Sequence, residues 1–379
     1  MIGKLAALLA GLAVAALTPC LHATETNTAA SKTGDMSQPR IEVCFVLDST
    51  GSMGGLIEGA KQKIWSIANT IISRKPTPLV KLGLITYRDR GDEYVTRRFD
   101  LTDDIDEVFN NLQTFRAGGG GDGPESVNEA LDMAVNRMSW STNTKAYKVV
   151  FLVGDFPPHM DYADDVKYAV TCETAVKNDL IINTIQCGNN QEAAEAWADI
   201  ARRAEGAYVA ISQSGSMALI DTPFDKDIAR LNTELAGTVL AYGSKSQKDS
   251  VARKTAAAAA APAAVTADRA LYNLKTEGKA VQGEGDLLSD MREKGLSLEV
   301  MTTEELPAEM QAIPEGERAA YLAKKQKDRE SVNAQLSALS RKRTEYIAAE
   351  NKRMAVAGKG ESFDAKVADT INSQADKKR

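Results

Sequence analysis

IEVCFVLDSTGS, residues 41–52, is the stretch of sequence that decides the fold. Its first seven residues are a short, β-branched and mostly apolar run, which predicts a strand buried on both faces. The acid and hydroxyls that follow, Asp48, Ser49, Thr50 and Ser52, predict a polar turn that leads into a helix. A buried strand joined in this way to a helix is the unit of a parallel α/β sheet.

The same alternation continues on the C-terminal side of this stretch. Apolar runs at 80–86, 149–153, 180–185 and 207–211 predict further strands, and segments with three-four apolar spacing between them predict helices, one of which begins at Pro124. Residues 94–99 alternate and carry charge after a short connection, which predicts an antiparallel edge strand. Residues 40–242 are therefore expected to form a doubly wound, mostly parallel α/β sheet with strand order 3-2-1-4-5-6, closed by a helix containing Ile228, Leu231, Leu235 and Val239.

Composition sets bounds on the protein's class. The chain has 379 residues, 43% of them hydrophobic and 26% charged, with a formal net charge of -6. This length and composition favour two folded parts. No strongly basic stretch exists to attract a polyanion, which argues against nucleic-acid binding.

The first residues are typical of a secretory signal. A charged start and the uncharged run Leu5–Leu17 precede small residues, so we expect a signal peptide at 1–23, cleavage after Ala23 and a short linker at 24–39. A membrane anchor is disfavoured because the apolar run is too short to span a bilayer. The less favoured alternative is lipoprotein processing at Cys20. The mature chain is expected to be periplasmic or secreted, with no membrane span.

Three cysteines would remain after cleavage. Cys44, Cys172 and Cys187 are an odd number, so at least one stays unpaired. The predicted helix and strand place Cys172 and Cys187 too far apart for a disulfide. We therefore expect buried free thiols.

The character of the sequence changes after residue 242. Residues 243–266 are rich in alanine and contain Pro262, which predicts an exposed linker. Residues 267–357 are expected to be mainly helical, with the charged segment Glu315–Met354 packed in a small bundle; an intermolecular coiled coil is the alternative. The tail at 358–379 is expected to be disordered.

Three polar segments could carry chemistry. They are Asp48–Ser52 after the first strand, the glycine-rich run Gly118–Glu125, and Asp155 at the end of the strand at 149–153. Taken singly, they could be a helix cap, a flexible or phosphate-binding loop, and a turn cap. In an open α/β sheet, however, ligands bind beyond the carboxyl ends of adjacent strands, where Asp48 and Asp155 would meet. Hard oxygen ligands of this kind suit Mg²⁺.

Together these segments resemble the von Willebrand factor A family, of a bacterial secreted or periplasmic type, with its metal-ion-dependent adhesion site. The Asp-x-Ser-x-Ser pattern stands here as Asp48-Ser49-Thr50-Gly51-Ser52, and the last acid is matched by Asp155. Where the family usually has a lone Thr, Asp122-Gly123-Pro124-Glu125 resembles the integrin β variant. The resemblance implies a Rossmann-like fold and one Mg²⁺, Mn²⁺ or Ca²⁺ ion. Its ligands would be Asp48, Thr50, Ser52, Glu125 and Asp155, with Asp122 less certain.

The resemblance also implies a function. A protein partner would complete the coordination of the metal with an Asp or Glu carboxylate, so we expect a binding module and no enzyme. One alternative is a metal-dependent hydrolase that uses His159 beside the acids. The other is an envelope scaffold in which the metal is only structural.

Overall fold

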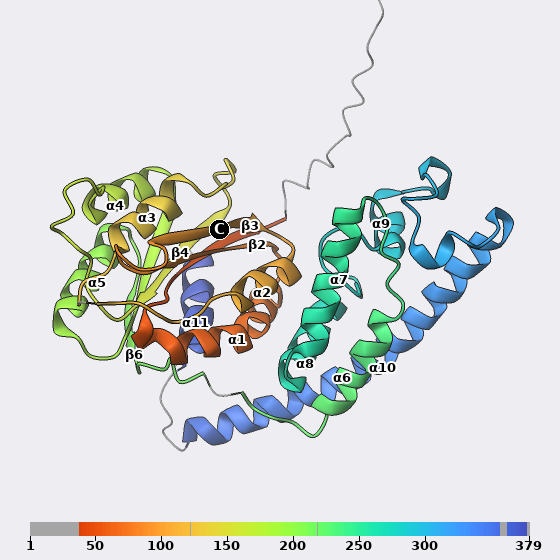
Figure 1. Cartoon of the computed structure of the whole chain (residues 1–379). Coiled ribbons are helices and arrows are strands. Elements are labelled where there is room, and N and C mark those ends of the chain that lie inside the picture. The colour runs from red at the N-terminus through yellow and green to blue at the C-terminus, as the bar shows by residue number, and fades with distance from the viewer. Residues whose placement is uncertain (1–37, 122, 218, 357–361, 377–379) are drawn as a thin grey trace, which may run out of the picture. The chain divides into compact units, whose positions relative to one another are not determined.

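The structure is a computed structural model, and it describes residues 38–121, 123–217, 219–356 and 362–376 (Figure 1). The predicted signal peptide, Cys20 and all but the last two residues of the N-terminal linker lie outside this range, as does Asp122. These expectations therefore stay predictions.

The centre of the N-terminal half is a six-stranded sheet with the order β3-β2-β1-β4-β5-β6. Only β3 runs antiparallel, on the edge beside β2. Both the strand order and the antiparallel edge strand confirm the prediction from the sequence. The strands are β1 (Arg40–Asp48), β2 (Leu79–Tyr87), β3 (Thr96–Thr102), β4 (Tyr147–Gly154), β5 (Leu180–Cys187) and β6 (Tyr208–Ile211).

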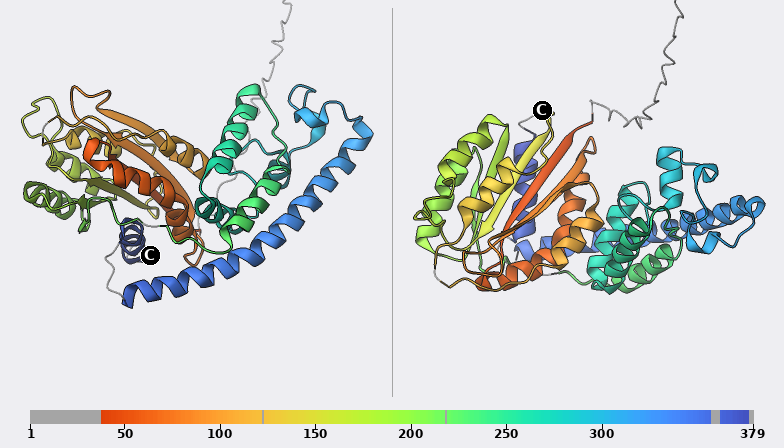
Figure 2. Two further views of the ribbon diagram at one scale, coloured as in Figure 1. Left: turned by 60° about the horizontal axis from the view of Figure 1, so that its bottom comes forward. Right: turned by 45° about the horizontal axis from the view of Figure 1, so that its top comes forward.

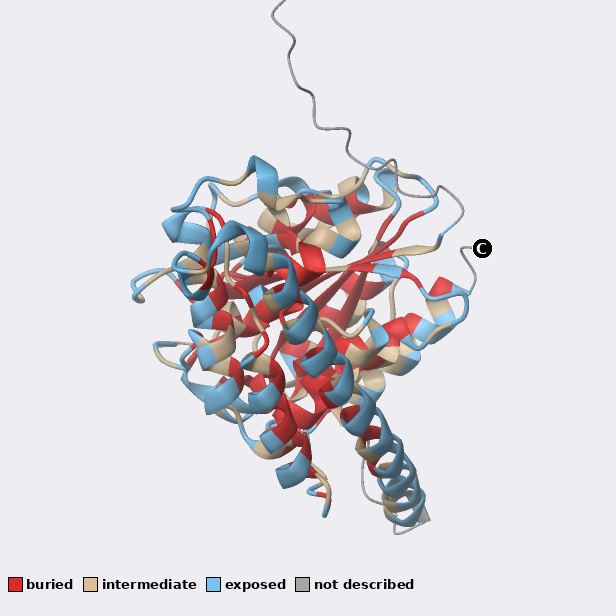
Figure 3. Ribbon diagram, turned by 90° about the vertical axis from the view of Figure 1, so that its right-hand side faces the viewer, coloured by how far each residue is buried: buried red, intermediate tan, exposed pale blue. Residues whose placement is uncertain are grey.

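Helices cover both faces of the sheet (Figure 1). On one face lie α1 (Gly54–Ile72), which follows a short 3-10 turn at Gly51–Met53, together with α2 (Ile105–Gln113) and α11 (Phe363–Ala375). On the other lie α3 (Val127–Asn136), α4 (Tyr168–Lys177) and α5 (Gln191–Arg203). Successive side chains of a strand point to opposite faces, so Val43 and Phe45 join the first layer while Cys44 and Val46 join the second. Figure 3 shows the resulting buried strands between partly exposed helices.

The cysteines agree with the prediction. Cys44, Cys172 and Cys187 are free and buried. Cys172 lies within α4, and Cys187 is the last residue of β5. Burial raises the pKa of each thiol, which keeps it in the unreactive protonated form.

The helix α6 (Asp225–Ala236) differs from expectation, because it does not close the sheet domain. Its residues Ile228, Leu231 and Leu235 are buried in a separate cluster with helices α8 (Ala263–Lys275) and α10 (Glu315–Val356). The three-four spacing is compatible with either packing partner, so the sequence predicted the buried face correctly but assigned it to the wrong layer.

The predicted exposed linker at 243–266 is also wrong. The chain there forms α7 (Lys245–Ala260) and the start of α8 (Ala263–Lys275). A capping box between Ser244 and Gln247 begins α7, and Val251, Lys254 and Ala258 are buried along one side. Pro262 stands at the N-cap of α8, where its missing N–H costs nothing.

The C-terminal helical region is confirmed, and its longest element is α10 (Glu315–Val356), which runs unbroken alongside α6 and α8 (Figure 2). Val332 and Leu336 of α10 pack on those helices, while Leu322 joins a cluster with α9 (Leu287–Lys294). Short 3-10 turns at Leu298–Val300 and Ala308–Met310 connect α9 to α10. Among the helices that the structure describes, none is long and apolar enough to cross a membrane.

The tail predicted to be disordered contains a helix instead. Helix α11 (Phe363–Ala375) buries Phe363, Val367 and Ile371, which recur every four residues, against the sheet. The ring centroids of Phe363 and Phe45 lie 6.3 Å apart. Such spacing predicts one apolar helix face, and its packing here stabilises a helix too short to persist alone.

Candidate metal centre

The carboxyl ends of β1 and β4 lie side by side and bring two acids together. Leu47 pairs with Val153, so Asp48 at the end of β1 faces Gly154, and Asp155 follows directly. A Cβ atom on Gly154 would lie 3.1 Å from the Cβ of Asp48 and 2.4 Å from the Tyr87 hydroxyl. The strands reach this separation because Gly154 has no side chain.

The first loop folds its own hydroxyl against Asp48. The backbone N–H and the hydroxyl of Thr50 both donate to Oδ1 of Asp48, at 2.8 and 2.7 Å. The hydroxyl oxygens of Thr50 and Ser52 lie 3.4 Å apart. Asp48 and Thr50 are buried whereas Ser52 is exposed, so this loop opens to solvent at Ser52.

The glycine-rich run lies against the first loop. Gly118 donates its N–H to Ser49 O at 3.0 Å, and Gly51 donates to Gly119 O at 3.2 Å. Gly120 has a φ of 79°, and a Cβ there would lie 3.1 Å from the Cβ of Thr50 and 3.4 Å from Oε1 of Glu125. A glycine is needed at this position because the backbone is left-handed and passes between two site residues.

Glu125 is held differently from the prediction. Helix α3 begins at Val127, so Glu125 precedes it and instead forms a parallel bridge with Pro158. Its N–H donates to Pro157 O, and its carbonyl accepts from His159 N, both at 3.0 Å. This short ladder fixes Glu125 beside the loop that follows β4, with its side chain buried.

Asp155 has a partner that sequence reasoning missed. Its Oδ2 accepts a hydrogen bond of 2.7 Å from Nε2 of Gln213, in the loop after β6. Gln213 is exposed and stands in a run of small polar residues, so no local pattern marks it.

When the acids are ionised, three buried carboxylate oxygens in this crevice have no hydrogen-bond donor among the described residues. They are Oδ2 of Asp48, Oε2 of Glu125 and Oδ1 of Asp155. Burial raises the pKa of Asp48 to about 8 and that of Glu125 to about 9, and the charges of the neighbouring acids add to both shifts. A buried carboxylate without a donor is costly, and a cation is the partner that satisfies several at once.

The donor set fits a hard divalent ion. No group of three or more His, Cys, Asp and Glu side chains among residues 38–376, within the described ranges, has the closeness of a preformed metal cage. The expected ligand set, however, combines hydroxyls with carboxylates. The hydroxyls of Thr50 and Ser52 lie beside the two acids Asp48 and Asp155. Glu125 lies on the other side of Gly120 from Thr50. Oxygen-only donors of this type suit Mg²⁺, Mn²⁺ or Ca²⁺.

His159, named in the hydrolase alternative, lies near this crevice but is held by other groups. Its Nδ1 lies 2.8 Å from Asp161 Oδ1, and its Nε2 lies 3.4 Å from Asp89 Oδ2. The ring stacks on Tyr162 with centroids 4.0 Å apart. This side chain therefore packs the loop after β4.

Comparisons with known proteins cover the sheet domain. Residues 42–222 match the sequence profile of the von Willebrand factor A domain. The chain is 27% identical over 154 residues to a protein of Acanthamoeba polyphaga mimivirus described as ariadne-like RING finger protein R811, covering 40% of this chain and 14% of that protein. It is 30% identical over 122 residues to the alpha-protein kinase vwkA of Dictyostelium discoideum, covering 31% of this chain and 19% of that protein. The chain thus spans less than a fifth of the length of these relatives.

Two solved structures show weaker likeness. The chain is similar to proximal thread matrix protein 1 from the mussel byssus, with a zinc-occupied MIDAS motif, at 16% identity and a TM-score of 0.35, over 46% of this chain and 42% of that one. It is similar to the SpRpn10 VWA domain at 17% identity and a TM-score of 0.35, over 46% of this chain and 89% of that one. The sequence match and the doubly wound sheet agree: residues 42–222 have the sequence pattern of a von Willebrand factor A domain on a doubly wound α/β sheet.

Proposed function

We propose that this domain binds a protein partner through one divalent cation, Mg²⁺ in the first place, with Mn²⁺ and Ca²⁺ as alternatives. The observation that carries the proposal is the convergence of three buried carboxylate oxygens that have no hydrogen-bond donor when ionised, from Asp48, Glu125 and Asp155. The hydroxyls of Thr50 and Ser52 complete the proposed ligand set. Asp122, the less certain ligand, lies outside the described residues.

The hydrogen bonds support different roles for the oxygens of Thr50, Asp48 and Asp155. Thr50 donates its hydroxyl proton to Oδ1 of Asp48, so its lone pairs can face a cation. Oδ2 of Asp48 and Oδ1 of Asp155 remain as acceptors without donors. A bound divalent ion would accept oxygen ligands at about 2.1–2.6 Å and leave a position for an outside oxygen.

The exposed end of the site suggests how a partner would approach. Ser52 is the exposed member of the ligand set, whereas the acids lie deeper. An Asp or Glu carboxylate of a partner can reach a cation from this side and add the negative charge that the ion favours. We place this activity outside the cytoplasm, because residues 1–23 have the charge and apolar pattern of a secretory signal.

The test combines metal binding with partner capture. Wild-type protein and Asp48→Ala are titrated with Mg²⁺ by calorimetry and then used as bait on an envelope fraction, with Mg²⁺ or with EDTA. We expect wild type to bind Mg²⁺ and to retain a discrete protein only with Mg²⁺, and Asp48→Ala to do neither. The matched control is Asp161→Ala, which removes an acid from a largely exposed position near the site.

The outcomes separate the functional classes. Capture by wild type that persists in EDTA would favour the scaffold alternative. Mg²⁺-dependent turnover of a phosphoester that is lost in Asp48→Ala would favour the hydrolase. Absence of Mg²⁺ and Mn²⁺ binding by wild type would contradict the proposal.

A further inference from the structure

We infer that Gln213 is a positioning residue of the metal centre: its carboxamide anchors one oxygen of Asp155 and so directs the other toward the cation. The inference deepens the proposed function and rests on it. It concerns a residue of the loop after β6, which contributes none of the proposed ligands.

The hydrogen bonds of Gln213 connect two parts of the site. Nε2 donates to Oδ2 of Asp155 at 2.7 Å. The same nitrogen lies 3.4 Å from the carbonyl oxygen of Ser52 and 3.6 Å from the sulfur of Met53. One amide group therefore joins the acid that follows β4 to the loop that follows β1.

The hydrogen bond from Gln213 makes the two oxygens of Asp155 different. Oδ2 has its donor, whereas Oδ1 is buried and has none among the described residues. A carboxylate fixed by one oxygen cannot rotate freely, so Oδ1 presents a defined direction to a ligand. Partners of this kind, which orient a metal ligand without touching the metal, typically change metal affinity by about 10–100-fold when removed.

A glycine just after β5 makes room for the amide. Gly188 directly follows β5 and has a φ of 80°. A Cβ at this position would lie 2.4 Å from Oε1 of Gln213, closer than atoms of a folded protein approach. Because Gly188 lacks a side chain, the carbonyl end of Gln213 fits there while its nitrogen points at Asp155.

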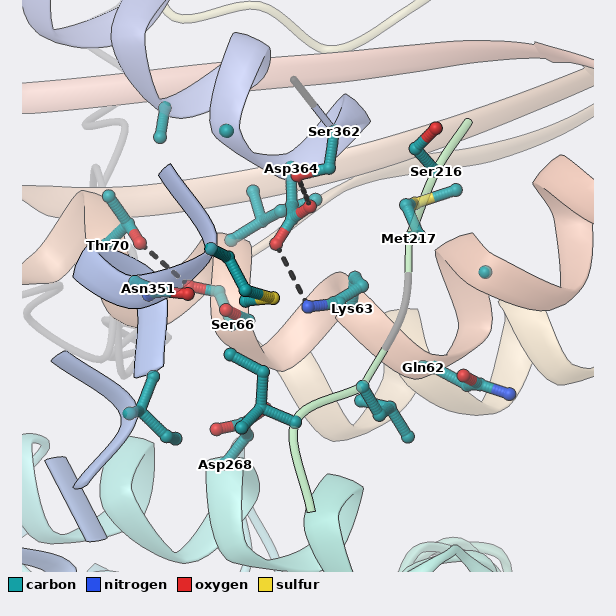
Figure 4. A pocket seen from close by; sticks show the side chains of 18 of the residues that line it. Gln62, Lys63, Ser66, Thr70, Ser216, Met217, Asp268, Asn351, Ser362 and Asp364 are labelled. Atoms are coloured by element: carbon teal, nitrogen blue, oxygen red, sulfur yellow. Dashed lines mark hydrogen bonds and ion pairs between the residues drawn. The ribbon is translucent and has the colours of Figure 1, made fainter. Parts of the chain in front are cut away.

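The loop that carries Gln213 is anchored on its far side. The Gly215 carbonyl accepts from the N–H of Phe363, the first residue of α11, at 3.0 Å, and Met217 is buried. A groove of about 920 Å³ borders this anchor between α1, α10 and α11, and in it Lys63 points toward Asp364, 3.2 Å away (Figure 4). Gln213 therefore extends from a segment that packs against α1 and α11.

The exposure of Gln213 makes the inference testable. The residue as a whole is exposed, and only its amide end reaches the acids. Replacing it should leave the packing of the domain intact. A loss of metal affinity would then report on the orientation of Asp155 and not on unfolding.

The experiment uses the full chain and Mg²⁺ alone as the probe. Gln213→Met keeps the length of the side chain but removes the donor, and Ser214→Ala changes the neighbouring exposed residue as a matched control. We expect Gln213→Met to bind Mg²⁺ about tenfold more weakly than wild type. Ser214→Ala should bind like wild type, and all three proteins should have the same Tm in EDTA.

Two results would overturn the inference alone. The first is wild-type Mg²⁺ affinity in Gln213→Met while Asp48→Ala binds none. The second is a fall in the Tm of Gln213→Met in EDTA, since the residue would then act on folding. If wild type itself binds no divalent ion, both the proposed function and this inference are wrong. The wild-type titration therefore distinguishes a failure of the proposed function from a failure of the inference alone.

Discussion

Thr50 donates both its backbone N–H and its hydroxyl to one oxygen of Asp48, and the other oxygen of Asp48 stays buried without a donor. This asymmetry differs from a simple helix cap, in which a polar side chain accepts from backbone N–H groups of the first helical turn. Here the donors come from the loop itself, and Asp155 lies close enough to raise the pKa of Asp48. The arrangement favours a ligand role over a capping role for Asp48.

The first prediction concerns the charge of Asp48. In Asp48→Asn the new amide can donate toward Asp155. The unfolding free energy of this variant in EDTA should therefore equal that of wild type or be higher by up to about 1 kcal/mol. Adding Mg²⁺ to a free concentration about 100 times Kd should raise the unfolding free energy of wild type by about 2.7 kcal/mol. It should not change the unfolding free energy of the variant. Denaturant unfolding with Mg²⁺ and with EDTA measures both. An equal gain from Mg²⁺ in the variant would contradict the proposed ligand role.

The second prediction concerns pH. In the metal-free protein the pKa of Asp48 is about 8 and that of Glu125 about 9, both above their ordinary values of 3.8 and 4.5. The folded state thus binds more protons than the unfolded state between roughly pH 4 and pH 9, so metal-free stability falls as pH rises through that window. Metal binding requires the unprotonated acids, so Mg²⁺ affinity should rise with pH up to about 9.

Calorimetry in two buffers of different ionisation enthalpy at neutral pH measures this linkage. Wild type should release protons on binding Mg²⁺, and Glu125→Gln should release fewer, because one titrating acid is gone. Equal heats in the two buffers would show that the acids are already ionised, contrary to the prediction.

The third prediction concerns the close approach of β1 and β4. In Gly154→Ala the added methyl would meet Tyr87 and Asp48, so we expect a loss of about 1–3 kcal/mol of unfolding free energy and weaker Mg²⁺ binding. Gly121→Ala is the matched control, since a Cβ there has no atom within 4 Å. Urea unfolding and Mg²⁺ titration compare the two. Comparable behaviour of both variants would mean that the strands can separate without cost.

Much of this domain could be predicted because its signals are local. Each buried strand is a continuous apolar run, and strand ends in a parallel sheet meet at one edge, so Asp48 and Asp155 could be placed together from their positions alone. The structure also brings Thr50, Ser52 and Glu125 to this edge, although Glu125 arrives on a short bridge and not on a helix.

The remainder could not be predicted because it depends on distant partners. The apolar face of α6 gives no sign of whether it packs on the sheet or on α10. Alanine-rich α7 has a weak apolar side, and its burial depends on groups such as Asp104, which pairs with Lys254. Gln213 acts through a single amide that reaches across two loops, a contact that only the folded chain creates.

The fourth prediction concerns the C-terminal helix α11. Phe363 is buried between α1 and the sheet, so Phe363→Ala should lower the unfolding free energy by about 3–5 kcal/mol. Asp369→Ala changes an exposed residue of the same helix and should stay near wild type. Thermal and urea unfolding distinguish the two. A wild-type transition in Phe363→Ala would mean that α11 does not contribute to the core.

The fifth prediction concerns the buried ion pair between α2 and α8. Arg269 donates from Nε and Nη2 to the two oxygens of Asp106 at 2.6 and 2.8 Å, and Asp106 also accepts from the N–H of Gln282. Arg269→Met leaves the Asp106 carboxylate buried without its cation, which should cost about 3–5 kcal/mol. Because the pair links the sheet domain to the helical region, both should unfold in one transition in wild type.

Two comparisons isolate this pair. The double variant Asp106→Leu/Arg269→Met removes both charges and should be more stable than Arg269→Met alone, since no uncompensated charge remains. Arg230→Met breaks an exposed pair with Glu234 and should cost at most about 1 kcal/mol. Two separate transitions in wild type would show that the helical region folds independently of the sheet domain. A cost for Arg269→Met no larger than that for Arg230→Met would show that this pair does not stabilise the contact between them.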